Sequence, residues 1–367
     1  MRLRSSYRWI LAGLAIMIVC LLCVGYWRGV FDVSPDAKLD VVVFPDKNLE
    51  KAVRIAINKP AGDILKTDLV DTDTDAVETG LTMLVADRAG IKDLTGLEYC
   101  TDLTRLSLGL NQLSDLSAVE GLINLTELNL GENRISDISA VAGLTKLETL
   151  NLYSNQISDI SAVAGLTNLA WLHLESNQIS DISAVAGLTN LDRLYLRSNR
   201  IVDLSALATL TNLTQLRLWN NQISDISALA GLTNLRWLFL FDNQISDINA
   251  LAGLTNLVRL YLDDNQIGDI SALRYLTNLQ ELNLASNQIS NVSALAGLTK
   301  LTTLNLNGNK ISDISALVTN AGIDSGDKVD LTDNPLSQDA LCKDIPALEA
   351  RGVKFSYDGK CGGGDGG

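Results

Sequence analysis

The chain has 367 residues, of which 47% are hydrophobic, and it carries a formal charge of −14 at pH 7. An acidic balance of this size argues against nucleic acid as a partner, because binding to phosphates needs a basic surface. The sequence contains a single histidine, which excludes a metal site made of several histidines.

Residues 1–28 have the features of a membrane signal. Three arginines precede Trp9–Trp27, an uncharged segment of nineteen residues that would span about 28 Å as a helix. Aromatic residues at the ends of this segment, and arginines before it, predict an uncleaved anchor that starts on the cytoplasmic side. A cleaved signal peptide is the alternative. In both cases we expect the remaining chain to be extracytoplasmic, either anchored to the cytoplasmic membrane by this helix or secreted.

A spacer at 29–39 leads into a block, 40–80, that has no counterpart elsewhere in the chain. We expect it to form an N-terminal cap, because the first unit of a repeat array would otherwise expose its leucines to water. Asp40–Phe44 is strand-like in composition, and a short second helical piece is expected at Lys66–Val70.

The longest helix expected in this cap follows Asp46, which is a suitable N-cap residue, and ends near Ile57. Its apolar residues Leu49, Val53 and Ala56 would lie on one side of the helix and face the rest of the cap.

Ten asparagines recur at intervals of 22 residues and define a repeat region at 81–333. Each lies in the frame L-x-x-L-x-L-x-x-N-x-[IL], and a degenerate eleventh copy, with Ala89 in the asparagine position, begins at Leu81. The asparagines are Asn111, Asn133, Asn155, Asn177, Asn199, Asn221, Asn243, Asn265, Asn287 and Asn309. One such repeat cannot bury its leucines alone, whereas stacked repeats share a continuous core. The period therefore predicts one elongated α/β solenoid with parallel strands about 4.8 Å apart.

Two polar columns of the repeat have structural explanations. The asparagine can satisfy backbone groups of the turn with both its donor and its acceptor. Within the phrase I-S-D-I-S-A, serine and aspartate can cap a turn by accepting backbone N–H bonds. A calcium ladder is the alternative, but a calcium site needs several oxygen ligands at one point. The aspartates are Asp93, Asp115, Asp137, Asp159, Asp181, Asp203, Asp225, Asp247, Asp269 and Asp313.

The period changes at the far end, where Asn334 follows the last regular asparagine by 25 residues. We expect a C-terminal cap at 334–361 and a Gly-rich tail at 362–367. Cys342 and Cys361 bracket this cap and are candidates for a disulfide in an oxidising compartment, with two free thiols as the alternative.

Cys100 has a different setting. It occupies the repeat position that holds Leu144 and Leu166 in later copies. We therefore expect a buried thiol in the core.

The repeat frame from Leu81 to about Asn334 resembles the 22-residue leucine-rich repeats of bacterial internalins and of SDS22-like proteins. The segment FPDKNLEKAVRIAINKP resembles the helical cap of internalin-like proteins, and DNPLS…IPALEARGVKF resembles the terminating unit of bacterial repeat proteins. The resemblance implies a curved solenoid with a parallel β-sheet on its concave face, closed by a helical N-terminal cap and a C-terminal cap. It also implies ligand recognition on the concave face.

Large rings and arginines gather at the concave positions of the middle repeats. These positions alternate with the core leucines, so their side chains point away from the core. All three tryptophans outside residues 1–28 occupy such positions, and Trp, Tyr and Arg dominate binding hot spots. The residues expected to bind a ligand are Tyr153, Trp171, His173, Arg193, Tyr195, Arg197, Arg217, Trp219, Trp237, Phe239, Phe241, Arg259 and Tyr261. The four arginines among them could lie over the ring faces.

These residues predict a recognition protein that binds a protein ligand by burying the central rings. Carbohydrate binding is an alternative, because sugar faces also stack on tryptophan and tyrosine. A structural spacer without a ligand is a third possibility, since aromatic residues favour strands and could cover their own backbone. The end repeats lack the rings, which favours a binding face.

An enzyme is not expected, and neither is a cofactor. The columns beside His173 offer Asn151 and Tyr195, so a nucleophile for a catalytic triad is missing there. Glu175 and Asp263 belong to repeats four apart, about 19 Å by strand spacing, which is too far for a glycosidase pair.

Overall fold

The computed structural model describes residues 40–71 and 80–362. The chain divides into two compact units, Met1–Val42 and Val43–Gly367, and the repeats belong to the second. The predicted anchor and spacer lie outside the described residues, as does the Gly-rich tail beyond Gly362. Within the described residues, no helix combines the length and the apolar character that crossing a membrane requires.

The predicted cap helix is confirmed as α2 (Lys47–Ala56). Asp46 caps it by accepting the backbone N–H of Asn48 at 2.9 Å and that of Leu49. Leu49 and Val53 are fully buried, but Ala56 is exposed because it is the last residue of the helix. The buried side of α2 is therefore shorter than predicted.

Two other expectations for the cap have different outcomes. The short helix η1 (Lys66–Asp68) lies where a second helical piece was predicted. The strand predicted at 40–44 is reduced to a single bridge residue, Val41. Phe44 is buried nevertheless, so the apolar pattern of this segment reflects burial without a strand ladder.

One parallel sheet runs through the repeat region, with its strands in sequence order. The strands are β1 (Met83–Val85), β2 (Arg105–Ser107), β3 (Glu127–Asn129), β4 (Thr149–Asn151), β5 (Trp171–His173), β6 (Arg193–Tyr195), β7 (Gln215–Arg217), β8 (Trp237–Phe239), β9 (Arg259–Tyr261), β10 (Glu281–Asn283), β11 (Thr303–Asn305), β12 (Lys328–Asp330) and β13 (Lys354–Ser356). Equivalent residues of neighbouring repeats are in register, as for Leu216 and Leu238. This confirms the α/β solenoid, and β13 extends its sheet into the C-terminal cap.

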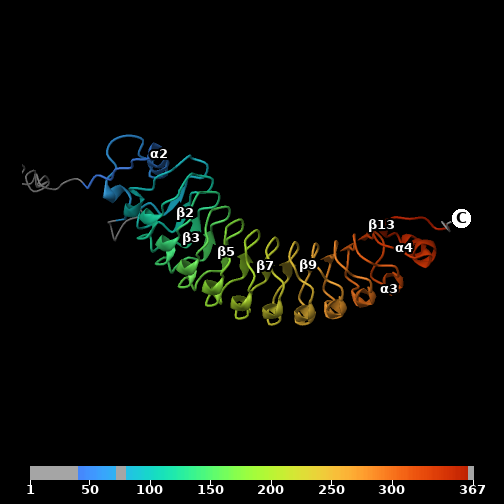
Figure 1. The fold of residues 1–367 in the computed structure, drawn as a ribbon. Coiled ribbons are helices and arrows are strands. Elements are labelled where there is room, and N and C mark those ends of the chain that lie inside the picture. The colour runs from blue at the N-terminus through green and yellow to red at the C-terminus, as the bar shows by residue number, and fades with distance from the viewer. Residues whose placement is uncertain (1–39, 72–79, 363–367) are drawn as a thin grey trace, which may run out of the picture. The chain divides into compact units, whose positions relative to one another are not determined.

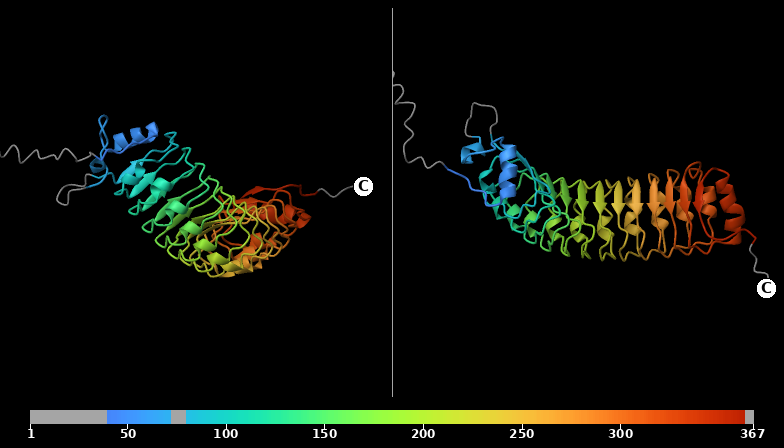
Figure 2. Two further views of the ribbon diagram at one scale, coloured as in Figure 1. Left: turned by 60° about the vertical axis from the view of Figure 1, so that its left-hand side comes forward. Right: turned by 90° about the horizontal axis from the view of Figure 1, so that it is seen from above.

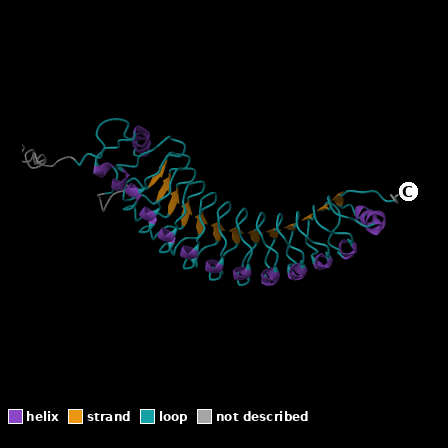
Figure 3. Cartoon of the chain, viewed as in Figure 1, coloured by secondary structure: helices purple, strands orange, loops and turns teal. Residues whose placement is uncertain are grey.

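Short helical turns form the opposite side of the solenoid. They are η2 (Leu97–Tyr99), η3 (Ser117–Val119), η4 (Ser139–Val141), η5 (Ser161–Val163), η6 (Ser183–Val185), η7 (Ser205–Leu207), η8 (Ser227–Leu229), η9 (Asn249–Gly253), η10 (Ser271–Tyr275), η11 (Ser293–Gly297) and α3 (Ser315–Thr319). The strands line the inner side of the curve and the helical turns its outer side (Figure 1, Figure 3). Seen from above, the strands lie side by side like the rungs of a ladder (Figure 2). The stack curves because a helical turn is wider than a strand.

Leucines and isoleucines of successive repeats form one continuous core. Leu216, Leu218 and Ile223 of one repeat are fully buried, as are their equivalents in the other repeats. Cys100 is confirmed as a buried free thiol, and burial, aided by the charge of Glu98, raises its pKa to about 12.

The asparagine column bonds neighbouring repeats together. The Asn221 side chain donates to the carbonyls of Leu196 and Leu218, at 3.1 and 2.9 Å, and accepts the backbone N–H of Ile201 at 3.0 Å. The same pattern recurs through the column and extends to Asn334. Both uses of the side chain that the sequence predicted are confirmed.

The aspartate column caps the convex turns. Asp181, for example, accepts the backbone N–H of Ser183 at 2.8 Å. The serine hydroxyl donates to the aspartate in several repeats, as Ser205 does to Asp203 at 2.9 Å, so aspartate is the residue that accepts in these caps. Within residues 40–71 and 80–362, no group of three or more acidic, histidine or cysteine side chains is placed to hold a metal ion.

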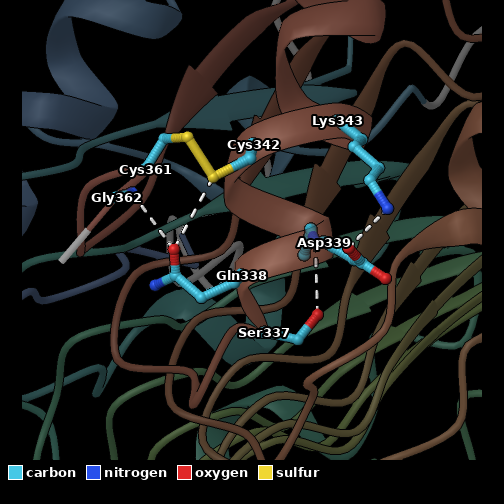
Figure 4. Close-up of a disulfide and its surroundings, with 8 residues drawn as sticks. Ser337, Gln338, Asp339, Cys342, Lys343, Cys361 and Gly362 are labelled. Atoms are coloured by element: carbon cyan, nitrogen blue, oxygen red, sulfur yellow. Dashed lines mark hydrogen bonds and ion pairs between the residues drawn. A yellow bond between two sulfur atoms is a disulfide. The ribbon is translucent and has the colours of Figure 1, made fainter. Parts of the chain in front are cut away.

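A helical segment and a disulfide close the C-terminal end. The π-helical turn η12 (Ala340–Asp344) and α4 (Ile345–Glu349) precede β13, and Cys342 forms the predicted disulfide with Cys361 (Figure 4). The Gln338 side chain accepts the backbone N–H of Gly362 beside this bridge.

Candidate functional site

The sequence-predicted binding residues all lie on the concave face, on strands or two residues beyond them. Trp237 and Phe239 are the outer residues of β8, on either side of the fully buried Leu238. Phe241 follows at the same two-residue period, with the buried Leu240 before it. The alternation of side chains along a strand therefore places the rings as the sequence predicted. Their role in binding stays a prediction.

Four rings form a first cluster: Tyr153, Trp171, His173 and Tyr195. His173 stacks on Tyr153 with ring centroids 5.2 Å apart and on Trp171 at 6.0 Å. Tyr195 meets the edges of both Trp171 and His173, at 5.9 and 5.3 Å. These separations are those at which aromatic pairs attract one another, so the cluster is held together by its own contacts.

A second cluster consists of Trp219, Phe239, Phe241 and Tyr261. Trp219 stacks on Phe241 with centroids 4.9 Å apart and planes inclined by 20°. Phe239 is edge-on to Trp219 at 5.8 Å and to Tyr261 at 5.0 Å. Each ring of this cluster thus comes from a strand or loop adjacent to that of its neighbour.

Arginines connect the rings. The guanidinium of Arg217 lies 3.9 Å from the ring centre of Tyr195 and 5.8 Å from that of Trp219, so it links the two clusters. Arg197 lies 5.3 Å from the ring centre of Trp219. Cation–π contacts of this kind hold the guanidinium groups in place over the aromatic surface.

The other two arginines differ in behaviour. Arg259 lies 5.1 Å from the ring centre of Trp237 and also forms an ion pair with Glu281 at 3.0 Å. Arg193 forms an ion pair with its neighbour Asp192 at 3.2 Å and has no ring contact within the described residues. Arg197, Arg217 and Arg259 therefore lie over ring faces, whereas Arg193 pairs with a carboxylate.

The rings cover one another in part. Tyr195 is buried, with 7% of its surface exposed, whereas the other rings of the two clusters are half-buried. Tyr195 donates its hydroxyl hydrogen to Gln215 at 2.8 Å, and Tyr261 donates to Glu281 at 2.8 Å. The concave surface is thus preformed, which lowers the ordering cost of binding.

Glu175 is a polar residue at the base of the first cluster. One carboxylate oxygen hydrogen-bonds His173 Nε2 at 3.0 Å, and the other lies 3.7 Å from the Arg217 guanidinium. About nine-tenths of the Glu175 side chain is buried, and its Oε1 has no hydrogen bond, nor has the buried Nε1 of Trp171. This arrangement ties His173 into the ring cluster.

Asp263 lies at the other side of the second cluster. Its Oδ1 is buried and has no hydrogen-bond partner. Burial raises the pKa of Asp263 to about 6, its own backbone N–H opposes this rise, and the charges of Asp264 and Asp242 add to it. Glu175 and Asp263 occupy the concave positions that hold rings in neighbouring repeats, as their place in the sequence indicates, but they were not among the residues predicted to bind a ligand.

The end repeats carry a small polar surface in place of the rings. Asn151 donates to Asn129 at 2.9 Å, and Asn129 donates to Ser107 at 2.9 Å. Arg105 and Glu127 form an ion pair at 3.0 Å. These side chains satisfy one another and leave the sheet covered without aromatic residues.

One hollow of the described surface does not involve the rings. It is a shallow, polar cavity of about 560 Å³ beside the strands, whose lining includes Asn234, Arg236, Asn256 and Lys300. Its asparagines donate to threonine carbonyls of the preceding repeat, so they have a structural role. We therefore place the candidate site on the ring clusters and not in this cavity.

Family comparisons agree with the fold. A family described as Leucine Rich repeats (2 copies) matches residues 123–165, 167–209, 189–231, 233–275 and 277–319, and a second family, Leucine Rich repeat, matches 99–120. No curated protein matches the sequence.

The solved structures that are similar to this chain include two internalins and one other bacterial protein. An internalin (inlF) from Listeria monocytogenes is 33% identical, with a TM-score of 0.79, over 88% of this chain and 94% of that one. An internalin C2 (inlC2) from the same organism is 43% identical, with a TM-score of 0.55, over 59% and 92%. A leucine-rich repeat protein from Leptospira interrogans is 26% identical, with a TM-score of 0.66, over 74% and 70%.

Proposed function

The chain belongs to the leucine-rich repeat proteins of the internalin type, and from this premise we propose that it binds a protein ligand through the centre of its concave face. Proteins of this family mediate recognition of other proteins, and the similarity to internalins supports an extracellular or surface location. The observation that carries the proposal is the pair of ring clusters on the concave sheet, joined by Arg217. The proposed contact residues are the thirteen predicted from the sequence.

Binding would be driven by burial of the half-exposed ring surface. Removing apolar surface from water contributes about 25 cal/mol per Å², and the rings already stand in fixed positions before a ligand arrives. Arg197 and Arg217 lie against Trp219, where they can orient a ligand by hydrogen bonds to its polar groups.

A purely structural role for the rings is less well supported. The end repeats cover the same sheet with the Asn129–Asn151 amide ladder and the Arg105–Glu127 ion pair, so the fold does not need aromatic cover. Residues that the fold does not need, gathered on one face with a polar border, are typical of an interaction surface.

The proposal is tested by using the full chain and its variants to capture cell-surface proteins from the cells that the source organism encounters. We expect Trp219→Ala and Trp237→Ala each to weaken binding of the captured protein at least tenfold, as for hot-spot residues. Tyr275→Ala is the matched control, because Tyr275 is an exposed aromatic residue on the convex side. Parental affinity in both tryptophan variants, or binding to a glycan array without any protein ligand, would contradict the proposal.

Residues 1–28 are proposed to anchor the protein to the cytoplasmic membrane. The support is the uncharged segment Trp9–Trp27 preceded by three arginines. Fractionation of cells that express the full chain tests this: we expect the protein in the membrane fraction, with its first residues still present by mass spectrometry. A soluble exported protein that has lost these residues would show cleavage instead.

A further inference from the structure

One column of equivalent positions on the concave face changes in charge and polarity along the solenoid axis. The column consists of the residues two positions beyond the last residue of each strand, and five successive members are Glu175, Arg197, Trp219, Phe241 and Asp263. We call the last four of these the central column. It has a cation at one end, two stacked rings in the middle and a carboxylate at the other end.

The cation of the central column has no acidic partner. Among the described residues, Arg193, Arg217 and Arg259 each form an ion pair on the concave face, but Arg197 forms none. Glu175 is the carboxylate at the equivalent position of the preceding repeat, and it is bonded to His173 and lies near Arg217. The Arg197 side chain is exposed; its Nε donates to Ser198 Oγ at 3.3 Å, and its guanidinium lies over the Trp219 ring.

The carboxylate of the central column is also unpaired. The Oδ1 atom of Asp263 is buried without a donor, and the charges of Asp264 and Asp242, which add to the rise of its pKa, are acidic as well. Arg259, on the strand that precedes Asp263, is engaged by Glu281 instead. A cation supplied from outside would find an unopposed carboxylate here.

Between the two charges lies an apolar platform. Trp219 and Phe241 stack with centroids 4.9 Å apart, and both are partly exposed. Arg197 and Asp263 are separated by three repeats, which is about 14 Å at the strand spacing. An extended peptide covers that length in about four residues at about 3.4 Å per residue.

We infer that the ligand segment of this concave face is an extended, bipolar peptide lying along the solenoid axis. An acidic side chain pairs with Arg197, apolar side chains lie on Trp219 and Phe241, and a basic side chain four residues away pairs with Asp263. The inference rests on the proposed function and specifies the chemistry of its protein ligand. Charge complementarity selects this occupant, because both ends of the platform carry a charge that the protein itself leaves unmatched.

The test is selection of a random nine-residue peptide library on the full chain, followed by affinity measurement of the enriched peptides on variants. We expect enriched peptides to carry an acidic and a basic residue four positions apart with apolar residues between them. Arg197→Glu and Asp263→Lys should each reduce the affinity for these peptides at least tenfold. The double variant should recover most of the affinity, because a bipolar peptide can bind to it in the reverse direction.

Controls separate this inference from misfolding and from the proposed function. Arg105→Gln alters a concave arginine of an end repeat and should leave peptide binding unchanged, and Arg197→Gln and Asp263→Asn provide milder changes if a charge reversal disturbs folding. Two results would overturn the inference and leave the proposed function standing. One is enriched peptides whose binding needs Trp219 but which lack the paired charges. The other is a double variant that binds the peptides more weakly than both single variants. Selection that yields no peptide dependent on Trp219 would count against the proposed function itself.

Discussion

The ring of Trp219 stacks on that of Phe241, with centroids 4.9 Å apart and an angle of 20° between the planes. The two residues occupy the same position in consecutive repeats, so the contact exists only because the repeats stack in register. Each ring also lies beside a fully buried leucine, Leu218 or Leu240. The ring layer and the leucine layer are therefore separate, and substitutions can probe them separately.

We predict that Trp219→Ala and Leu218→Ala have different effects on stability. Leu218 is fully buried, so its truncation should lower the free energy of unfolding by about 3 kcal/mol. Trp219 is half-buried, and its truncation removes the stack on Phe241 and the edge contact with Phe239, for which we expect about 2 kcal/mol. Urea denaturation followed by circular dichroism measures both values. Equal losses would mean that the rings are part of the core.

The asparagine column should be more important for stability than an exposed asparagine of the same repeat. Asn221→Ala removes bonds to the backbone of Leu196, Leu218 and Ile201, and leaves groups inside the solenoid unpaired. We expect a loss of about 3 kcal/mol, because each orphaned group costs about 1–3 kcal/mol. The control is Asn212→Ala, which removes one bond at an exposed site. Similar melting temperatures for the two variants would refute the prediction.

Reduction of the Cys342–Cys361 disulfide should loosen the C-terminal cap. The bridge closes a loop with a sequence separation of 19 residues, for which chain entropy predicts about 3 kcal/mol. We expect faster hydrogen exchange in η12, α4 and β13 for the Cys342→Ser/Cys361→Ser double variant, with the central repeats unchanged. Cys100→Ala is the control, since this thiol is not bridged. Unaltered exchange in the cap would show that the bridge adds no stability there.

Asp263 should make the protein less stable as the pH rises from about 4 to about 6. Its pKa is about 6 in the folded protein, mainly through burial, and about 3.9 in an unfolded chain. The folded state therefore binds more protons in this window, so the free energy of unfolding falls as the pH rises. Asp242 and Asp264 face the group and strengthen the effect.

Asp263→Asn should remove this dependence and stabilise the protein at pH 7 by about 1 kcal/mol, after discounting for partial exposure. Denaturation curves at pH 4, 5, 6 and 7 provide the measurement. The same slope in the parent and in the variant would show that Asp263 is not responsible.

The aspartate column should have the opposite dependence on pH. Hydrogen bonds from the backbone and side chain of the following serine lower the pKa of Asp159, Asp181 and Asp225. A lowered folded-state pKa adds stability that is present above about pH 4 and lost as the pH falls below it. Acid denaturation of the parent should therefore begin below that value.

The chain contains its own control for this column. Asn291 occupies the aspartate position of one repeat and accepts the backbone N–H of Ser293 at 2.9 Å. Replacing Asp159, Asp181 and Asp225 together by asparagine should keep the caps at pH 7 and shift the acid transition to lower pH. Replacement of the same three residues by alanine should lower the melting temperature at pH 7. An unchanged acid transition in the asparagine variant would disprove the assignment.

The 22-residue period alone determined the solenoid, the direction of its strands and the face on which each ring lies. Side-chain alternation along a strand and stacking of identical repeats are local rules, so Trp237 and Leu238 could be assigned to opposite faces from their order in the chain. The N-cap of α2 at Asp46 and the Cys342–Cys361 disulfide could also be proposed from the sequence, because each depends on residues close in sequence.

Only the tertiary structure decided which partner each side chain takes. Arg193 pairs with Asp192 while Arg217 links two ring clusters, and both lie on concave strands of the same kind. The unpaired charges of Arg197 and Asp263 likewise emerge from the rotamers of their neighbours in adjacent repeats. The physical reason is that a repeat pattern specifies the backbone position of a residue and the face of the sheet on which its side chain lies. The contacts of that side chain depend on the competition among several charges and rings within a few ångströms.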